Sequence, residues 1–99
     1  MTLLLIFFQA YTMTIDKTLE ERGSRYGSFE GHAQITQDFK DIMRNTRNWE
    51  ILTPSMKEAL EMVSHKVGRI LNGDPTYADS WHDIAGYSQL VDKQLTQGK

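Results

Sequence analysis

The 99-residue sequence has no cysteine and no excess of basic residues. Without cysteine the chain can form no disulfide, no thiolate metal site and no cysteine nucleophile, and this usage favours a reducing, cytoplasmic setting. Eleven basic and 13 acidic side chains give a net charge of −2, so non-specific binding to nucleic acid or to membranes is not expected. Apolar residues make up 39% and charged residues 24%, which is ordinary for one folded domain of this length.

Long hydrophobic runs are also missing. The apolar run near the N-terminus extends only from Leu3 to Phe8, whereas a bilayer span needs about 20 residues. No basic residue precedes the run, and it is shorter than the roughly 7–15 apolar residues of a secretory signal. It is either a short buried strand or oligomer-forming segment or, as we prefer, an extension upstream of a native start at Met13. We therefore divide the chain into an apolar extension at 1–15 and one helical domain at 16–99.

Only two prolines interrupt the chain, and the residues that mark helix ends are few but well placed. Two glycines and two serines between Glu21 and Ser28 predict a turn, after which Ser28 can cap a helix over about 29–44. The apolar face of that helix contains Phe29, Ala33, Phe39 and Met43.

A second helix is predicted from Thr53 to Asn72. Thr53 is a suitable N-cap, Pro54 fits the first helical position because it lacks an N–H, and Asn72-Gly73 predicts a left-handed C-terminal stop. The apolar residues of this helix recur with the helical period and are Met56, Leu60, Val63, Val67, Ile70 and Leu71.

A third helix follows an irregular loop over 72–78, where Pro75 cannot lie inside a helix. It begins near Asp79 and ends at about Leu95. Outside the N-terminal segment no stretch alternates as a strand would, so the predicted fold is all-α, a small bundle of three main helices. Two tryptophans and four tyrosines are hard to cover in so small a bundle, so we expect oligomerisation, at least to a dimer, to complete it.

Acidic residues recur at helical spacing on the second and third predicted helices. Glu58 and Glu61 share one face of the second helix, and Asp79 and Asp83 share one face of the third. Carboxylates three or four residues apart can hold one cation, and an oxygen-rich site with open positions suits Mg²⁺ or Mn²⁺. The alternative is a solvated surface, with Asp79 as an N-cap and Asp83 as a first-turn acid that the helix dipole favours.

The three histidines allow several interpretations. His65 lies on the acidic face of the second helix, and His82 lies beside Asp83 on the third. His32 lies on the apolar face of the first helix, which is typical of a buried histidine satisfied by hydrogen bonds; a ligand or acid–base role is the alternative. The dipeptide His82-Asp83 resembles the HD pair of metal phosphohydrolases, which implies that the three histidines and Asp83 converge on a transition metal.

Basic residues suited to an anion occur in the predicted turn and on the second helix. Guanidinium and backbone N–H groups between Arg22 and Gly27 can bind an anion, with Tyr26 stacking on a base. The alternative is a tight loop held by Tyr26. Lys66 and Arg69 can bind the same anion as Arg25, or can pair with nearby acids.

Two stretches resemble a family of small proteins of tailed phages and prophages. They are E21-R-G-S-R-Y-G-S-F29 and E58-A-L-E-M-V-S-H-K-V-G-R-I-L-N-G-D-P-T-Y-A-D-S-W-H-D-I-A-G-Y87. The resemblance implies a phage accessory protein that acts in the cytoplasm of the bacterial host, and it implies no particular reaction.

The chain also resembles the MazG-like all-α nucleotide pyrophosphohydrolases. E58-A-L-E61 matches the first E-x-x-E element of that family, while D79-S-W-H82 stands where E-x-x-D is expected, with Asp83 one position late. The resemblance implies magnesium-dependent hydrolysis of nucleotide phosphoanhydrides. Glu58, Glu61, Asp79 and Asp83 would hold the metal, His82 or His65 would assist proton transfer, and Arg25, Tyr26, Lys66 and Arg69 would bind the substrate. The alternative is a non-enzymatic oligomeric phage protein that binds a host protein or sequesters a signalling nucleotide.

Overall fold

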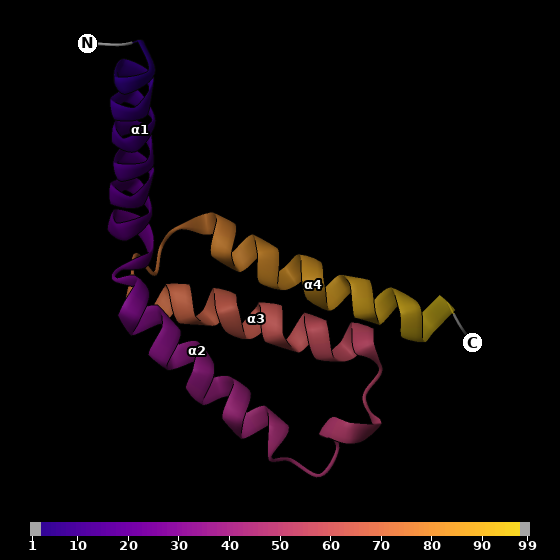
Figure 1. Ribbon diagram of the computed structural model, residues 1–99. Helices are drawn as coiled ribbons and strands as arrows, with labels where there is room; N and C mark the ends of the chain where they lie inside the picture. Colours follow the sequence, from indigo (N-terminus) through magenta and orange to yellow (C-terminus); the bar gives the residue numbers. More distant parts are fainter. Residues whose placement is uncertain (1–2, 98–99) are drawn as a thin grey trace.

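The computed structural model describes residues 3–97, with side chains from residue 14 onward, and this range contains helices and no strand. Figure 1 shows the α-helices, which are α1 (Leu3–Tyr26), α2 (Phe29–Arg44), α3 (Pro54–Asn72) and α4 (Ala78–Gln97), and the short 3-10 helix η1 (Trp49–Ile51). The all-α prediction is confirmed. The described range holds four α-helices where three main ones were predicted, because the N-terminal residues form a helix of their own.

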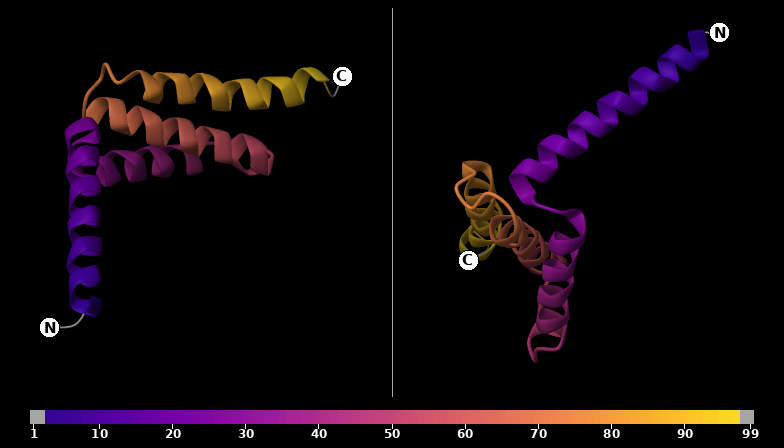
Figure 2. Two further views of the ribbon diagram at one scale, coloured as in Figure 1. Left: turned by 90° about the horizontal axis from the view of Figure 1, so that it is seen from above. Right: turned by 90° about the vertical axis from the view of Figure 1, so that its left-hand side faces the viewer.

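The central element is α3. One side of α3 packs against α2 and the other against α4, which returns antiparallel to α3 after the loop at 73–77 (Figure 1). Helix α1 projects from the end of this unit where the α3–α4 loop lies, and its C-terminal part approaches α2 and α3 (Figure 2). The molecule is accordingly elongated, with extents of 65 × 27 × 27 Å.

Helix α1 differs most from what the sequence predicted. The strand alternative for Leu3 to Phe8 is wrong, since these residues are helical. The turn expected over 21–28 is confined to its end: the helix continues through Gly23, whose carbonyl accepts a hydrogen bond from the Gly27 N–H at 2.9 Å. Gly27 then adopts a φ of 77°, a left-handed conformation that glycine tolerates, and the chain turns there into α2. The suggested native start at Met13 stays a prediction.

The predicted N-caps of α2 and α3 are confirmed. The Ser28 hydroxyl accepts a hydrogen bond from the Gly31 N–H at 3.1 Å, and the Thr53 hydroxyl accepts one from the Met56 N–H at 3.2 Å. Each side chain satisfies an amide that has no partner inside its own helix. Pro54 occupies the start of α3, as expected.

The C-terminal end of α3 is at the predicted residue but has a different geometry. The helix ends at Asn72, yet Gly73 has a φ of −129° and is not left-handed. A glycine is required there for another reason: a Cβ would collide with the backbone of Arg25 and Tyr26, so the end of α1 lies directly against Gly73.

Few of the described side chains are buried. Trp49 of η1 is the one large apolar side chain between residues 14 and 97 that is less than a tenth exposed. Leu60 and Leu71 of the predicted apolar face of α3 are exposed, as is Phe29 of α2. Helix α3 packs against α2 on one side and against α4 on another, so its contacts are not confined to the one apolar face that was predicted. Its most buried residue is Gly68. Within residues 3–97, no helix combines the length and apolar character needed to cross a membrane.

Candidate functional site

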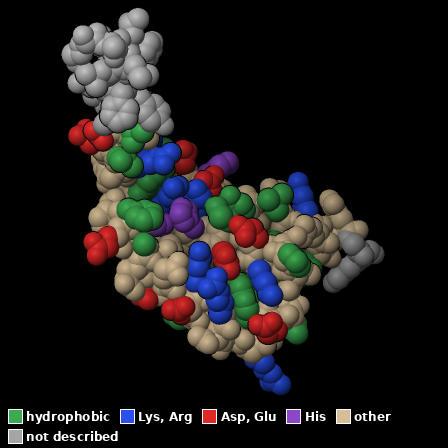
Figure 3. All heavy atoms as spheres, in the orientation of Figure 1, with side chains coloured by type: hydrophobic (Ala, Val, Ile, Leu, Met, Phe, Trp, Pro, Cys, Tyr) green, Lys and Arg blue, Asp and Glu red, His purple; other side chains and the backbone are tan. Residues whose placement is uncertain are grey.

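A cavity of about 410 Å³ lies where α1, α2 and α3 meet. Its walls come from the end of α1, the Gly27–Ser28 turn, the start of α2 and the second half of α3. Figure 3 shows histidine side chains next to basic and hydrophobic ones on this part of the surface. The side chains that carry the chemistry of the cavity are Arg22, Tyr26, Phe29, His32, His65 and Arg69.

Asn72 fixes the walls of the cavity. Its side-chain nitrogen Nδ2 donates hydrogen bonds to the carbonyls of Tyr26 and Ser28, both at 2.8 Å. Glycines make room for it, since a Cβ on Gly31 would lie 2.5 Å from the Asn72 amide oxygen and one on Gly27 would lie 2.7 Å from Nδ2. The turn between α1 and α2 is therefore held against the end of α3.

His32 of α2 and His65 of α3 face each other across the helix interface. Nε2 of His32 lies 3.2 Å from Nδ1 of His65, and the rings meet edge to face with their centroids 4.5 Å apart. His32 is only 6% exposed, and its other nitrogen, Nδ1, is buried without a hydrogen-bond partner. Gly68 allows this close approach, because a Cβ there would lie 3.1 Å from Nδ1 of His32 and 2.8 Å from the Thr36 methyl group.

Both histidines are neutral at pH 7. Burial, the largest cause, and the neighbouring His32, Arg69, Lys66 and Lys40 lower the pKa of His65 to about 4. Burial and Arg69 also lower the pKa of His32, while the Gly68 carbonyl opposes that change. The pair therefore presents uncharged imidazoles, and the positive charge at the cavity comes from its arginines.

Two of the arginines in this region, Arg25 and Arg69, are stacked on aromatic rings. The guanidinium group of Arg69 lies 4.0 Å from the centroid of the Tyr26 ring, and that of Arg25 lies 5.1 Å from the centroid of the Tyr77 ring. The two tyrosines meet edge to face at 6.1 Å. Within residues 14–97, no carboxylate forms a salt bridge with Arg22, Arg25 or Arg69. Their charge is therefore available to an anionic ligand.

The residues predicted to bind substrate are only partly brought together. Tyr26 and Arg69 line the cavity. Arg25 does not line it and stacks on Tyr77 instead. Lys66 points to α4 instead, where its ammonium group lies 2.9 Å from a carboxylate oxygen of Asp83.

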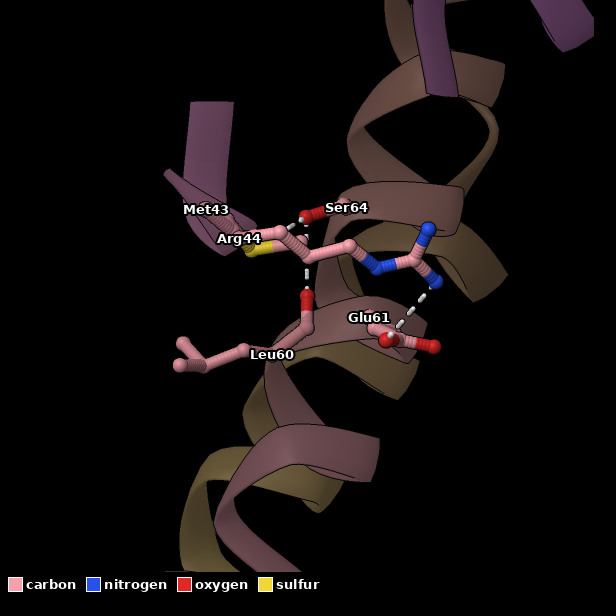
Figure 4. Close-up of polar contacts among 5 residues, drawn as sticks. All are labelled: Met43, Arg44, Leu60, Glu61 and Ser64. Atoms are coloured by element: carbon pink, nitrogen blue, oxygen red, sulfur yellow. Dashed lines mark hydrogen bonds and ion pairs between the residues drawn. The ribbon is translucent and has the colours of Figure 1, made fainter. Parts of the chain in front are cut away.

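The four predicted metal ligands are engaged at different places. Asp83 is paired with Lys66, whose hydrogen bond is the largest cause that lowers the pKa of the Asp83 carboxyl. Asp79 accepts a hydrogen bond from the Tyr77 hydroxyl at 3.0 Å. Glu61 faces α2 and lies 3.6 Å from the Arg44 guanidinium group (Figure 4).

Glu58 lies further along the α3–α4 pair, in a surface hollow with Tyr87 and Gln94 of α4. Lys66, which marks the level of Asp83, is eight residues further along α3, so the rise of an α-helix separates the two levels by about 12 Å. Across the described residues, no three His, Cys, Asp or Glu side chains are placed to hold one metal ion.

The two predicted catalytic histidines lie apart. His65 lines the cavity, whereas His82 is exposed on α4 and is not among the cavity residues. The HD-type interpretation needs His82 and Asp83 to converge with His32 and His65, and the described side chains form no such group.

The cavity combines residues that the sequence pointed to with others that it did not. Tyr26, His65 and Arg69 were candidates, and a ligand role for His32 was the alternative to a buried, satisfied side chain. The roles of Gly68 and Asn72 were missed. The available signal was Gly68 inside an otherwise regular helix, because an interior helical glycine often marks a close approach.

A comparison with known proteins adds a family. No curated protein and no solved structure matches the chain. A family model described as a domain of unknown function (DUF6378) matches residues 13–95, a range that contains all the residues of the cavity. The chain belongs to the DUF6378 family.

Proposed function

We propose that this protein binds a nucleotide or a related phosphorylated small molecule in the cavity between α1, α2 and α3 and hydrolyses a phosphoanhydride bond. The observation that carries the proposal is the presence of Arg22 and Arg69, which form no salt bridge with a carboxylate among residues 14–97, beside the neutral His32–His65 pair. Guanidinium groups bind phosphate oxygens through charge-assisted hydrogen bonds. A cavity of about 410 Å³ is large enough for a small ligand.

The cavity also offers a surface for a base. Phe29 is 83% exposed at the cavity, although it is the first residue of α2 and apolar. Aromatic faces stack on nucleobases without regard to sequence, and exposed stacking platforms are common in nucleotide-binding sites. We therefore propose that the nucleotide binds with its phosphate near Arg69 and its base near Phe29.

Binding of Mg²⁺ or Mn²⁺ stays a prediction that follows from the resemblance to the MazG-like family. Glu58, Glu61, Asp79 and Asp83 do not fit one metal site in the described chain, because Glu61 of α3 is paired with Arg44 of α2 whereas Asp83 of α4 is paired with Lys66. Ligand binding by the arginines does not depend on such a site. The test therefore includes both metal and chelator.

Calorimetric titration with ATP, dATP and inorganic pyrophosphate, in Mg²⁺, in Mn²⁺ and in chelator, measures binding directly. We expect Arg69→Gln to weaken nucleotide binding about tenfold or more, since a lost charge-assisted hydrogen bond costs about 1.5–3 kcal/mol. Arg47→Gln in the loop before η1 is the matched control and should bind as the natural sequence does. Absence of binding to every ligand would reject the proposal.

A second function, sequestration of a nucleotide without turnover, is favoured by the Lys66–Asp83 ion pair. At 2.9 Å this pair already neutralises an acid that a catalytic metal would need. The assay that separates the two functions is release of phosphate or pyrophosphate by protein that has been shown to bind. Release that needs a divalent metal supports hydrolysis, and binding without release supports sequestration.

We also propose that two copies of the chain associate through the apolar groove between α3 and α4. The accessible surface of the chain is 7738 Å², whereas about 5,800 Å² is expected for a folded monomer of this mass. Part of the excess belongs to α1, which stands away from the other helices (Figure 1). Leu60 and Leu95 at the groove are 44% and 49% exposed. An interface of standard size covers about 800 Å² on each partner, which the excess can supply.

The biological setting stays a proposal of the sequence resemblance. A phage accessory protein in the bacterial cytoplasm would act on host nucleotides or bind a host protein. If a host protein rather than a second copy covers the α3–α4 groove, the purified chain will be monomeric.

A further inference from the structure

The cavity between α1, α2 and α3 has the form of a wedge that the packing of the helices leaves unfilled. At its narrow end the Arg69 guanidinium group lies 4.0 Å from the centroid of the Tyr26 ring. Gly23 lines the cavity one turn earlier on α1, yet a Cβ added to Gly23 would meet no described atom outside α1 within 4 Å. Helix α1 therefore contacts α3 at its last turn and stands away from it before that turn, as its wide angle to the other helices also shows (Figure 2).

One face of α1 lines this wedge over about two turns. Leu19, Arg22, Gly23 and Tyr26 are separated by three or four residues, so their side chains lie on the same side of the helix. Leu19 is 59% exposed and Arg22 is also exposed, although both line the cavity. The rest of the described chain therefore does not cover the side chains that α1 turns towards the cavity.

The two walls of the wedge carry the same chemistry. Helix α1 supplies Leu19 and Arg22, and the opposite wall supplies Phe29 of α2 and Arg69 of α3. Neither arginine forms a salt bridge with a carboxylate within residues 14–97, so their like charges oppose closure of the wedge. An anion between the two guanidinium groups would replace this repulsion with charge-assisted hydrogen bonds on both sides. An apolar ring beside it would cover the exposed side chains of Leu19 and Phe29.

We infer that Leu19 and Arg22 form a clamp on α1, which closes on the ligand from the side opposite Phe29 and Arg69. The inference rests on the proposed function and adds that the phosphate lies between two arginines and the base between Leu19 and Phe29. Binding then orders the part of α1 that precedes Tyr26. Without ligand this part opens easily, because it is exposed and is attached at its C-terminal end.

Hydrogen exchange of the full chain, measured by mass spectrometry with and without ATP, tests the closure. A ligand that binds only the closed form slows exchange through the open form by the factor 1 + [L]/Kd. At about ten times the Kd from calorimetry, we expect exchange in residues 14–25 to slow about tenfold. Residues 86–97 of α4 are the internal control, and their exchange should not change.

Arg22→Gln separates the clamp from binding to the opposite wall alone. Arg69 is intact in this variant, so we expect ATP still to bind, about tenfold or more weakly. At the same multiple of its own Kd, exchange in residues 14–25 should no longer slow. Lys17→Gln is the matched control, because it removes a charge from the same helix outside the cavity, and it should keep the slowing.

The possible results distinguish this inference from the proposed function. If ATP binds without slower exchange in residues 14–25, or if Arg22→Gln keeps the slowing, the clamp is rejected and nucleotide binding stands. If ATP slows exchange but is not hydrolysed in Mg²⁺ or Mn²⁺, hydrolysis is rejected and the clamp stands. If neither ATP nor dATP nor pyrophosphate binds, both are rejected.

Discussion

At the residue scale, Gly68 is the position at which one added methyl group has the clearest consequence. Gly68→Ala places a Cβ 2.8 Å from the Thr36 methyl and 3.1 Å from the His32 ring. Overpacking of this kind costs about 1–3 kcal/mol, which outweighs the gain of up to about 1 kcal/mol from replacing a helical glycine with alanine. We therefore expect a loss in the free energy of unfolding, measured by urea denaturation.

Gly86→Ala in α4 is the matched control for that substitution. No atom outside its own helix lies within 4 Å of the Cβ that would be added, so only the gain in helix propensity remains. We expect this variant to be more stable than the natural sequence by up to about 1 kcal/mol. Equal effects of the two substitutions would contradict the close contact between α2 and α3 at the histidine pair.

The histidine pair also predicts how stability changes with pH. Above the ordinary histidine pKa of 6.5, neither the folded nor the unfolded chain binds protons at these rings. Between 6.5 and the folded pKa of His65 near 4, the unfolded chain binds protons that the folded chain excludes, so stability falls as the pH falls. The positive charges of Arg69, Lys66 and Lys40 also lower the pKa of His65 and strengthen the effect.

The expected loss is about 1–2 kcal/mol, because the cavity leaves His65 partly solvated and solvent screens its interactions. Denaturation in urea at pH 7.5, 6 and 5 measures it. Asp83 is a separate contribution, since a lowered carboxyl pKa removes stability only below its ordinary value of 3.8. His65→Gln should flatten the curve between pH 6.5 and 5, and an unchanged slope would show that the pair does not titrate as described.

At the scale of helices, the sequence predicted those ends that depend on a local side chain. Ser28 and Thr53 accept hydrogen bonds from amides within their own helical turn, and Pro54 fits the first turn because it lacks an N–H, so α2 and α3 begin as predicted. The end of α1 depends on contacts remote in sequence. Gly73 and the Asn72 side chain meet the α1–α2 turn, and the sequence cannot show which of several glycines makes that turn.

The same distinction explains the candidate site. Helical spacing puts Glu58 near Glu61, and His65 near Arg69, on the helix surface, but it does not indicate which neighbouring helix each side chain meets. In the structure Glu61 meets α2, whereas Lys66 meets Asp83 of α4. The cavity depends on packing between three helices, so its members could be suggested but not assembled from the sequence.

The attachment of the C-terminal end of α1 to the other helices leads to a prediction about the stability of this helix. The Asp74 N–H donates to the Arg25 carbonyl at 2.6 Å, and Arg69 stacks on Tyr26, so the last turn of α1 is held to α3 and the α3–α4 loop. Residues 14–22 are exposed. An exposed helix with few tertiary contacts opens easily. Limited trypsin digestion should therefore cut first at Lys17 or Arg22, and hydrogen exchange should be faster there than in α3.

Tyr26→Ala should extend this fast exchange to the end of α1, since it removes the ring that both Arg69 and Tyr77 contact. Tyr87→Ala on α4 is the control that removes a tyrosine away from α1. First cleavage at Lys57 or Lys66 of α3 would contradict the expected order of stability.

At the scale of the whole molecule, a single chain leaves its interior incomplete. Trp49 is the one buried large apolar side chain among residues 14–97, while leucines on α3 and α4 stay exposed on either side of an apolar groove. A core of this size contributes little to the free energy of folding of a short chain. The stability of the protein should therefore depend on association between copies. A stability that changes with protein concentration would distinguish such a dimer from a monomer.

For a dimer that unfolds as it dissociates, each tenfold increase in protein concentration adds about 1.4 kcal/mol to the apparent free energy of unfolding. We expect the thermal midpoint to rise by several degrees for each such increase, and light scattering after size exclusion to give twice the chain mass of 11.4 kDa. Leu95→Glu puts a charge into the α3–α4 groove and should give a monomer of lower stability, whereas Gln89→Glu, on α4 but outside the groove, should keep the dimer. A midpoint independent of concentration would reject association of two copies, and dimers of equal strength in both variants would place the interface elsewhere.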